Sequence, residues 1–215
     1  MQLLLLLGIL VAAVLLVQVG LLAIALDKLG ISAQGAFLLL MSSLAGSLIN
    51  LPLGYVRSDP PPPGLLDLYR RRSLWFPPRY RPGRTLIMVN VGGCLIPLAF
   101  CLYLLVKTPI TLGDVLVGAG IVTLVCRFVS RPVPGMGIVL PLFVAPLFAA
   151  LTAVLVAPDN SAPVAYVSGT LGVLIGADLL RLGDVRHMGA PMASIGGAGT
   201  YDGIFVTGIV AALLA

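Results

Sequence analysis

The sequence contains no glutamate and few charged residues of any kind. All eight acidic residues are aspartates, and charged residues make up 10% of the 215 positions, whereas a soluble domain has about 25%. A chain with so little charge cannot present a hydrated surface on every side, which excludes a soluble globular protein. Hydrophobic residues make up 59% of the chain, and the mean hydropathy is +1.10. The composition therefore predicts an all-α integral membrane protein.

Histidine and cysteine are also scarce, which bears on metal and redox chemistry. His187 is the single histidine, and the three cysteines, Cys94, Cys101 and Cys126, all fall in apolar segments. These four residues form neither a disulfide framework nor a zinc-ligand spacing. We therefore expect no metal and no other cofactor, and we expect His187 to lie in a surface turn.

Long apolar runs are what the sequence does contain. They predict a single polytopic domain over 1–215 with about seven transmembrane helices, because about 20 apolar residues are needed to cross a bilayer. Glycines at 196, 197 and 199 predict that the last helix is broken or re-entrant. Pro52 predicts a kink near the end of the second run, where we expect Asn50 to satisfy backbone groups. The predicted spans are 2–26, 32–56, 85–106, 115–129, 138–157, 164–180 and 192–215.

The basic residues predict an orientation for this arrangement. With the N-terminus in the cytoplasm, eleven of the thirteen basic residues fall in cytoplasmic loops, and only Lys28 and Lys107 fall outside. Positive charge in short loops marks the cytoplasmic face. We therefore expect a plasma (inner) membrane protein with a cytoplasmic N-terminus and an external C-terminus.

The predicted loop at 57–84 mixes proline, arginine and aromatic residues. It contains the run Pro60 to Pro63 and the basic cluster Arg70, Arg71 and Arg72. Such a juxtamembrane segment is typical of contact with the lipid bilayer, with its guanidinium groups on anionic lipid head groups. Docking of a partner protein is the alternative interpretation. Nucleic acid is not an expected partner, because the basic run is short and lies between two spans.

Two aspartates lie in apolar surroundings near the C-terminus. Asp178 falls near the end of the sixth predicted span and Asp202 inside the seventh. An ionisable side chain at membrane depth costs roughly 2.5–3.5 kcal/mol on insertion scales and is a functional-site hypothesis by default. Two close carboxyl groups can act as general base and general acid. The same pair could instead bind a proton or cation in transport, or each aspartate could simply cap a helix end.

The flanking residues complete the predicted site. Gly197, Gly199, Thr200 and Tyr201 immediately precede Asp202 and are the predicted binding positions. The Tyr201 hydroxyl is a candidate hydrogen-bond donor. Asp184 is expected to form a solvated ion pair with the arginines beside it, and such pairs contribute little.

Two resemblances attach to these residues. The stretches GADLLRLGD and GGAGTYDGIF resemble the C-terminal signature of a family of small bacterial and archaeal polytopic membrane proteins of unknown function. One aspartate late in the sixth span and another after a Gly-x-Gly in the next are similar to the GxGD-like intramembrane aspartyl proteases, namely presenilin, signal-peptide-peptidase and prepilin-peptidase. That second resemblance implies that Asp178 and Asp202 form a catalytic pair.

Three functions follow as expectations. The leading one is an aspartyl intramembrane-protease-like hydrolase acting on a transmembrane peptide substrate. The alternative is a proton- or cation-coupled transporter that uses the same two carboxylates. A non-catalytic membrane scaffold is the third. The composition is compatible with a homo-oligomer in each case.

Overall fold

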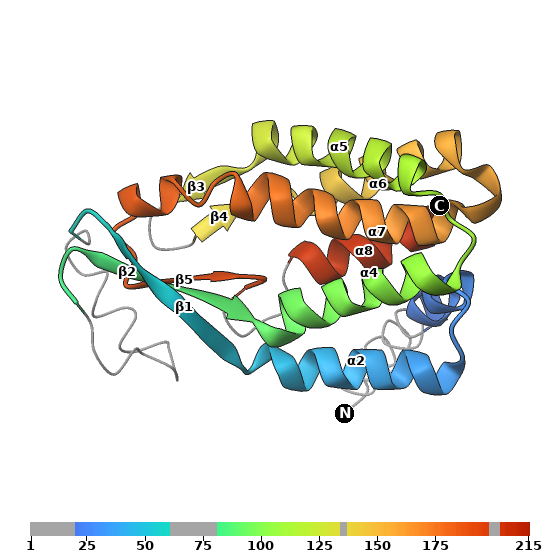
Figure 1. Cartoon of the computed structure of the whole chain (residues 1–215), viewed down its shortest axis with the longest axis horizontal. Coiled ribbons are helices and arrows are strands. Elements are labelled where there is room, and N and C mark those ends of the chain that lie inside the picture. The colour runs from blue at the N-terminus through green and yellow to red at the C-terminus, as the bar shows by residue number, and fades with distance from the viewer. Residues whose placement is uncertain (1–19, 61–80, 134–136, 198–202) are drawn as a thin grey trace, which may run out of the picture.

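The protein has a helical bundle at one end and a small β-sheet at the other (Figure 1). This computed structural model describes residues 20–60, 81–133, 137–197 and 203–215. The α-helices of these residues are Gly20–Lys28, α2 (Ala33–Ser47), α4 (Ile96–Lys107), α5 (Leu112–Val129), α6 (Val144–Val156), α7 (Ser161–Val173) and α8 (Gly203–Leu214).

The labelled helices run alternately in opposite directions. Helices α2, α5 and α7 run toward the sheet, and α4, α6 and α8 run away from it (Figure 1). Two of these helices adjoin a π-helix at the sheet end. The π-helix Val91–Leu95 (η1) precedes α4, and the π-helix Leu174–Leu179 (η3) follows α7. Both irregular segments therefore lie at the junction of bundle and sheet.

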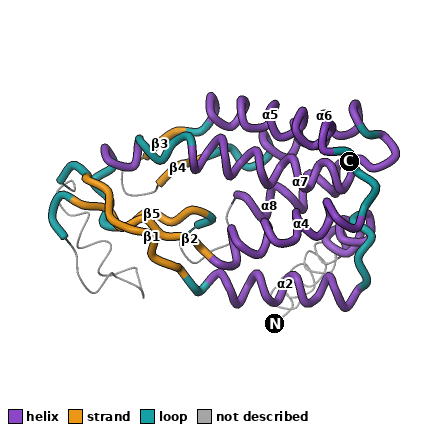
Figure 2. Tube along the Cα trace, in the orientation of Figure 1, coloured by secondary structure: helices purple, strands orange, loops and turns teal. Residues whose placement is uncertain are grey.

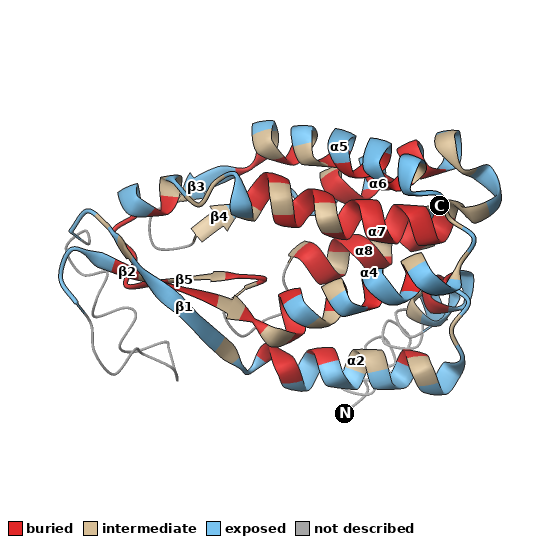
Figure 3. Ribbon diagram, viewed as in Figure 1, coloured by how far each residue is buried: buried red, intermediate tan, exposed pale blue. Residues whose placement is uncertain are grey.

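Helix α7 is the centre of the bundle. All of its residues from Ala162 to Val173 are buried except Leu171, which is half-buried, as the red ribbon of Figure 3 shows. Small residues let the neighbouring helices approach it closely. A Cβ added at Gly172 would lie 2.5 Å from the Val122 side chain of α5, and one added at Gly208 would lie 2.6 Å from Thr170 Oγ1.

The sheet contains three strands in the order β1-β2-β5 (Figure 2). Strand β1 (Asn50–Arg57) pairs antiparallel with β2 (Arg84–Asn90), and β2 pairs parallel with β5 (Met192–Ile195). Pro52 is accommodated because β1 is an edge strand, where a missing N–H donor is tolerated. A separate hairpin joins β3 (Arg131–Val133) to β4 (Gly137–Val139). Short 3-10 turns occupy Pro158–Asn160 and Asp184–His187.

The strands correct the prediction of an all-α protein: the described chain is mostly helical with a sheet. The predicted span 32–56 ends as a helix at Ser47, because Pro52 is incompatible with a helix interior and the following residues pair with β2. The predicted span 85–106 begins as strand β2, in which the β-branched residues Thr85, Ile87 and Val89 alternate. The start of the predicted span 192–215 is strand β5, and α8 begins only at Gly203.

The other predicted spans agree better with the structure. Helix α5 covers 115–129, and α7 with η3 covers 164–180. In the span predicted at 138–157, residues Gly137–Val139 are a strand and α6 starts at Val144, because Pro141 precedes the helix rather than kinking it.

Two helices of the described chain are long and apolar enough to cross a membrane. They are Leu112–Val129 and Pro158–Leu179. A third is present if Gly20–Lys28 and α2, which meet at a 110° bend, count as one broken span. The apolar helices Val91–Lys107, Val144–Val156 and Gly203–Leu214 are shorter. Helix length therefore does not establish the predicted number of about seven transmembrane helices.

The arginines and the lysines of the described residues lie at opposite ends of the molecule. Every arginine in the described residues lies at the sheet end, on or beside the strands and the adjoining helix termini. Lys28 and Lys107, the only two lysines of the chain, end helices at the opposite side of the bundle. The molecule thus has one strongly cationic end.

Candidate functional site

Asp178 lies on the π-helix η3, where α7 ends against the sheet. Its Oδ2 accepts a hydrogen bond of 3.3 Å from the backbone N–H of Gly196, and the residue is half-buried. A π-helical turn widens the helix and is frequent at functional sites. Asp178 therefore presents a partly sheltered carboxylate that is held by a main-chain donor.

Glycines bring the backbones around Asp178 into contact. A Cβ at Gly176 would overlap the Thr123 carbonyl, so η3 packs directly on α5. Gly196 has a φ of +81°, in the left-handed region that favours glycine, and a Cβ there would lie 2.6 Å from Cys94 Cβ. Only glycine at 196 lets this N–H reach Asp178 at so crowded a place.

The remaining predicted site residues are only partly covered. Gly197 is described and half-buried with a φ of +83°, whereas Gly199, Thr200, Tyr201 and Asp202 lie outside the described residues. The chain on both sides of them is described. Gly196 contacts Asp178, and a Cβ added at Gly203 would lie 4.0 Å from Val173 at the end of α7. Both flanks of the segment carrying Asp202 therefore meet the helix that carries Asp178.

A buried amide network lies next to this site at the start of the sheet. Asn90 Oδ1 accepts from the Gly93 N–H at 2.7 Å, and Asn90 Nδ2 donates to the Ser47 carbonyl at 2.7 Å and to Asn50 Oδ1 at 3.2 Å. Ser194 Oγ donates to the same Asn50 oxygen at 2.7 Å. The prediction that Asn50 satisfies backbone groups is wrong, since its oxygen serves two side chains.

The amide network and the Asp178 site join through two glycines. A Cβ at Gly93 would overlap the Gly196 carbonyl, so the backbones of η1 and of the turn after β5 touch. Residue spacing did not predict this cluster, because its members come from α2, β1, β2, η1 and β5. The available signal was the presence of two asparagines, Asn50 and Asn90, in otherwise apolar runs.

Arg181 anchors the end of η3 to helix α5. Its guanidinium donates to Ser130 Oγ at 3.1 Å, to the carbonyls of Arg127 and Ser130 at 2.7 and 2.6 Å, and to Asp184 at 3.0 Å. A cation at a helix C-terminus satisfies free carbonyls and the helix dipole. The predicted ion pair between Asp184 and Arg181 is confirmed, but it is only partly solvated, since the Arg181 side chain is 15% exposed.

His187 lies at the surface, which confirms its prediction. Its Nδ1 is 3.0 Å from Asp59 Oδ2, and both side chains are largely exposed. Within the described part of the chain, no three His, Cys or Asp side chains gather closely enough to hold a metal ion.

Hydroxyl groups form a second polar feature, inside the bundle. Tyr166, Ser168 and Thr170 of α7 are fully buried, and their hydroxyls make no hydrogen bond of good geometry within the described residues. The Tyr166 ring packs edge-on against Phe100 of α4 at 5.0 Å. Buried hydroxyls without partners are costly unless water reaches them.

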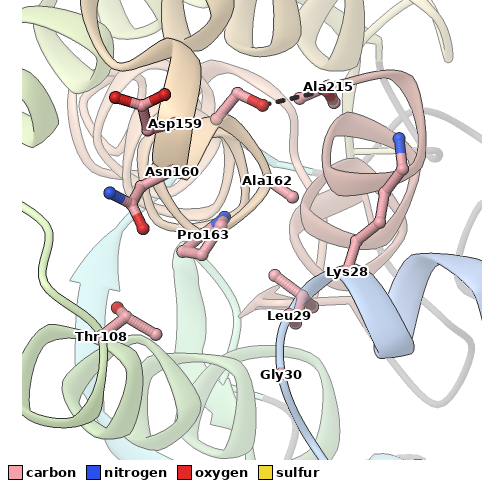
Figure 4. Close-up of a pocket in the computed structure, with 10 residues that line it drawn as sticks. Lys28, Leu29, Gly30, Thr108, Asp159, Asn160, Ala162, Pro163 and Ala215 are labelled. Carbon is pink, nitrogen blue, oxygen red and sulfur yellow. Dashed lines mark hydrogen bonds between the residues drawn. The ribbon is translucent and has the colours of Figure 1, made fainter.

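A pocket of about 370 Å³ opens at the other end of α7, far from Asp178 (Figure 4). Lys28 Nζ donates to the Leu213 carbonyl at 3.0 Å, and Ser161 Oγ donates to the Ala215 carbonyl at 2.9 Å, across the pocket wall. The sequence did not predict this pocket, because its lining comes from four segments that are far apart in the chain. Its polar lining residues are Lys28, Thr108, Asp159, Asn160 and Ser161.

The sequence matches the family DUF1614, described as a protein of unknown function, over residues 44–214. The chain belongs to DUF1614. This confirms the prediction of a family without a known function. No curated protein and no solved structure matches the chain. The DUF1614 match includes Asp178, the amide network and the Arg181 anchor, so all three lie inside the region that defines the family.

Proposed function

We propose that this DUF1614 protein is an intramembrane aspartyl hydrolase that cleaves transmembrane peptides with Asp178 and Asp202. The observation that carries the proposal is the hydrogen bond from Gly196 to the Asp178 carboxylate. This bond links Asp178 to Gly196, which precedes Asp202 by six residues in the sequence. The contact of Gly203 with Val173 supports a return of that chain to the same helix.

The proposed membrane arrangement has about seven crossing segments, with the arginine-rich end in the cytoplasm of an inner (plasma) membrane. The alternating directions of the helices support it (Figure 1). The separation of arginines from lysines supports the orientation, because positive charge gathers on the cytoplasmic side. Asp178 is then reached from the cytoplasmic face.

The two carboxyl groups have complementary roles in this proposal. Asp178, whose oxygen accepts a main-chain N–H, is suited to the ionised form and takes a proton from water. The water oxygen forms a bond to the peptide carbonyl carbon while protonated Asp202 donates its proton to the carbonyl oxygen. Collapse of this tetrahedral intermediate breaks the C–N bond: the proton held by Asp178 passes to the leaving amine, and one hydroxyl of the intermediate returns its proton to Asp202 as the carboxyl group of the product forms.

The test uses purified protein in liposomes with a pool of single-span reporter peptides. Asp178→Asn and Asp202→Asn are each expected to abolish cleavage, whereas Asp184→Asn, near the same end of the molecule, is expected to retain it. Cleavage that survives either of the first two changes in a folded protein contradicts the proposal.

A proton- or cation-coupled transporter is the second candidate, favoured by one observation. Helix α7 carries the far pocket at its start, the buried hydroxyls along its length and Asp178 on the π-helix that follows it. Such a line of polar groups is what a proton or cation path requires. Flux across the same liposomes that disappears in Tyr166→Phe, without any cleavage of peptides, would favour the transporter.

The scaffold hypothesis depends on the loop 57–84. Arg57 and Arg84 face each other as the last pair of the β1–β2 ladder, while Arg70, Arg71 and Arg72 lie outside the described residues. The Arg81 guanidinium stacks on the Tyr55 ring, 4.8 Å from its centroid. We retain contact with anionic lipid head groups as the proposed role of this end.

A further inference from the structure

The hydrogen bonds of the amide network leave only one orientation for the Asn50 side chain. The Gly93 N–H must find an acceptor, so Asn90 turns its Oδ1 toward Gly93 and its Nδ2 toward Asn50. Asn50 then has to present its own oxygen to Asn90. The Ser194 hydroxyl donates to that same oxygen, which strengthens the assignment.

This orientation turns the Asn50 amide nitrogen outward. No described residue accepts a hydrogen bond from Asn50 Nδ2, although the residue is half-buried. Exposed apolar residues precede it in the chain: Leu48 is 58% exposed and Ile49 is 51% exposed. Figure 3 shows β1 as a largely exposed strand at this junction. A pre-oriented double N–H donor without an acceptor among the described residues therefore lies at this junction.

The distance to Asp178 fits a peptide. Ser194 holds Asn50 and lies two residues before Gly196, which holds Asp178. Along that route the two side chains are separated by no more than about five residues of extended chain at roughly 3.3 Å each. An apolar transmembrane peptide has main-chain carbonyls as its acceptors, and these are exposed wherever its helix unwinds.

We propose that Asn50 is a substrate-binding residue, whose side-chain N–H groups bind a main-chain carbonyl of a transmembrane peptide within about five residues of the cleaved bond. Asn90 and Ser194 are positioning residues that fix the direction of this donor. The choice of a peptide as the ligand and its distance to the cleaved bond rest on the proposed hydrolase function, whereas the orientation of the Asn50 donor does not.

The test measures binding rather than cleavage. A single-span reporter peptide is titrated onto Asp178→Asn protein in nanodiscs, with and without the further change Asn50→Asp. Aspartate keeps the oxygen that Asn90 and Ser194 need but removes both N–H donors. We expect the peptide to bind at least tenfold more weakly, with an unchanged thermal melt by circular dichroism. An unchanged dissociation constant would overturn the proposal.

Asn160→Asp is the matched control. It makes the same chemical change in the far pocket, and we expect peptide binding to stay within about twofold. Weakening of binding by both changes to the same extent would indicate a charge effect and would also overturn the proposal.

A second measurement covers the case in which Asn50→Asp does not fold. A photoreactive side chain replaces exposed Leu51, beside Asn50, or exposed Leu155 on α6 as the control. We expect peptide crosslinks from position 51 and not from position 155. Crosslinks from position 51 to lipid alone would overturn the proposal in favour of lipid ester carbonyls. Peptide binding at Asn50 without cleavage by the native protein would refute the hydrolase and leave this site standing.

Discussion

At the scale of single residues, the candidate site depends on close approaches that one methyl group would prevent. Gly196 combines a positive φ with a position where a Cβ would meet Cys94. A sequence shows that glycines are present, but it does not show which of them touches another backbone. Asp178 was predictable because a charge in an apolar run is conspicuous, whereas its Gly196 partner was not.

Gly196→Ala is therefore expected to damage both stability and function. Backbone strain in the left-handed region costs about 1–3 kcal/mol, and the clash with Cys94 adds to it. Thermal unfolding in detergent should shift downward, and peptide cleavage should be lost with the Asp178 contact. Gly120→Ala is the control, because its site on α5 is exposed and open. Equal melting temperatures for the two variants would contradict this account.

Arg181 supplies a second prediction at this scale. Arg181→Met removes donors from the Arg127 and Ser130 carbonyls at the end of α5, and hydrogen bonds to charged groups contribute roughly 1.5–3 kcal/mol each. We expect a clear loss of stability, measured by denaturant titration. Arg186→Met, which removes a single exposed contact with Gly183, should change stability by less than about 0.5 kcal/mol. Similar losses in both would refute the anchoring role.

At the scale of elements, hydrophobicity located the two longest helices of the bundle better than the segments at its sheet end. Helices α5 and α7 lie where apolar runs placed them. The runs containing β1, β2 and β5 are apolar and lack a clear polar alternation, so periodicity does not distinguish these strands from helices. Pairing between segments far apart in the chain decided their structure, and no local pattern reports it.

The junction between sheet and bundle gives a prediction for Asn90, which is fully buried. Asn90→Ala leaves the Gly93 N–H and the Ser47 carbonyl without their partner, and each buried unpaired group costs about 1–3 kcal/mol. We expect this variant to be among the least stable, by thermal melt. Asn160→Ala, at a helix start where Asn160 makes no capping bond, should be close to neutral. A neutral Asn90→Ala would show that the network contributes little.

At the scale of the whole molecule, the separation of the two lysines from the arginines predicts which end faces the cytoplasm. The three native cysteines are buried, so a new surface cysteine can be labelled selectively. We expect Asp159→Cys to react with a membrane-impermeant maleimide added outside intact cells. Ser58→Cys, at the sheet end, should react only after permeabilisation. The reverse pattern would invert the proposed orientation and place Asp178 on the outer face.

The parallel pairing of β2 with β5 also has a consequence for biosynthesis. Strand β2 ends at Asn90 and β5 begins at Met192, so about 100 residues must be made between them. A ribosome adding 5–20 residues per second needs roughly 5–20 s for that length. During this interval one edge of β2 lacks its partner strand, while α4, α5, α6 and α7 are synthesised. The Asp178–Gly196 contact can form only after residue 196 has been made, so the candidate site is completed late in synthesis.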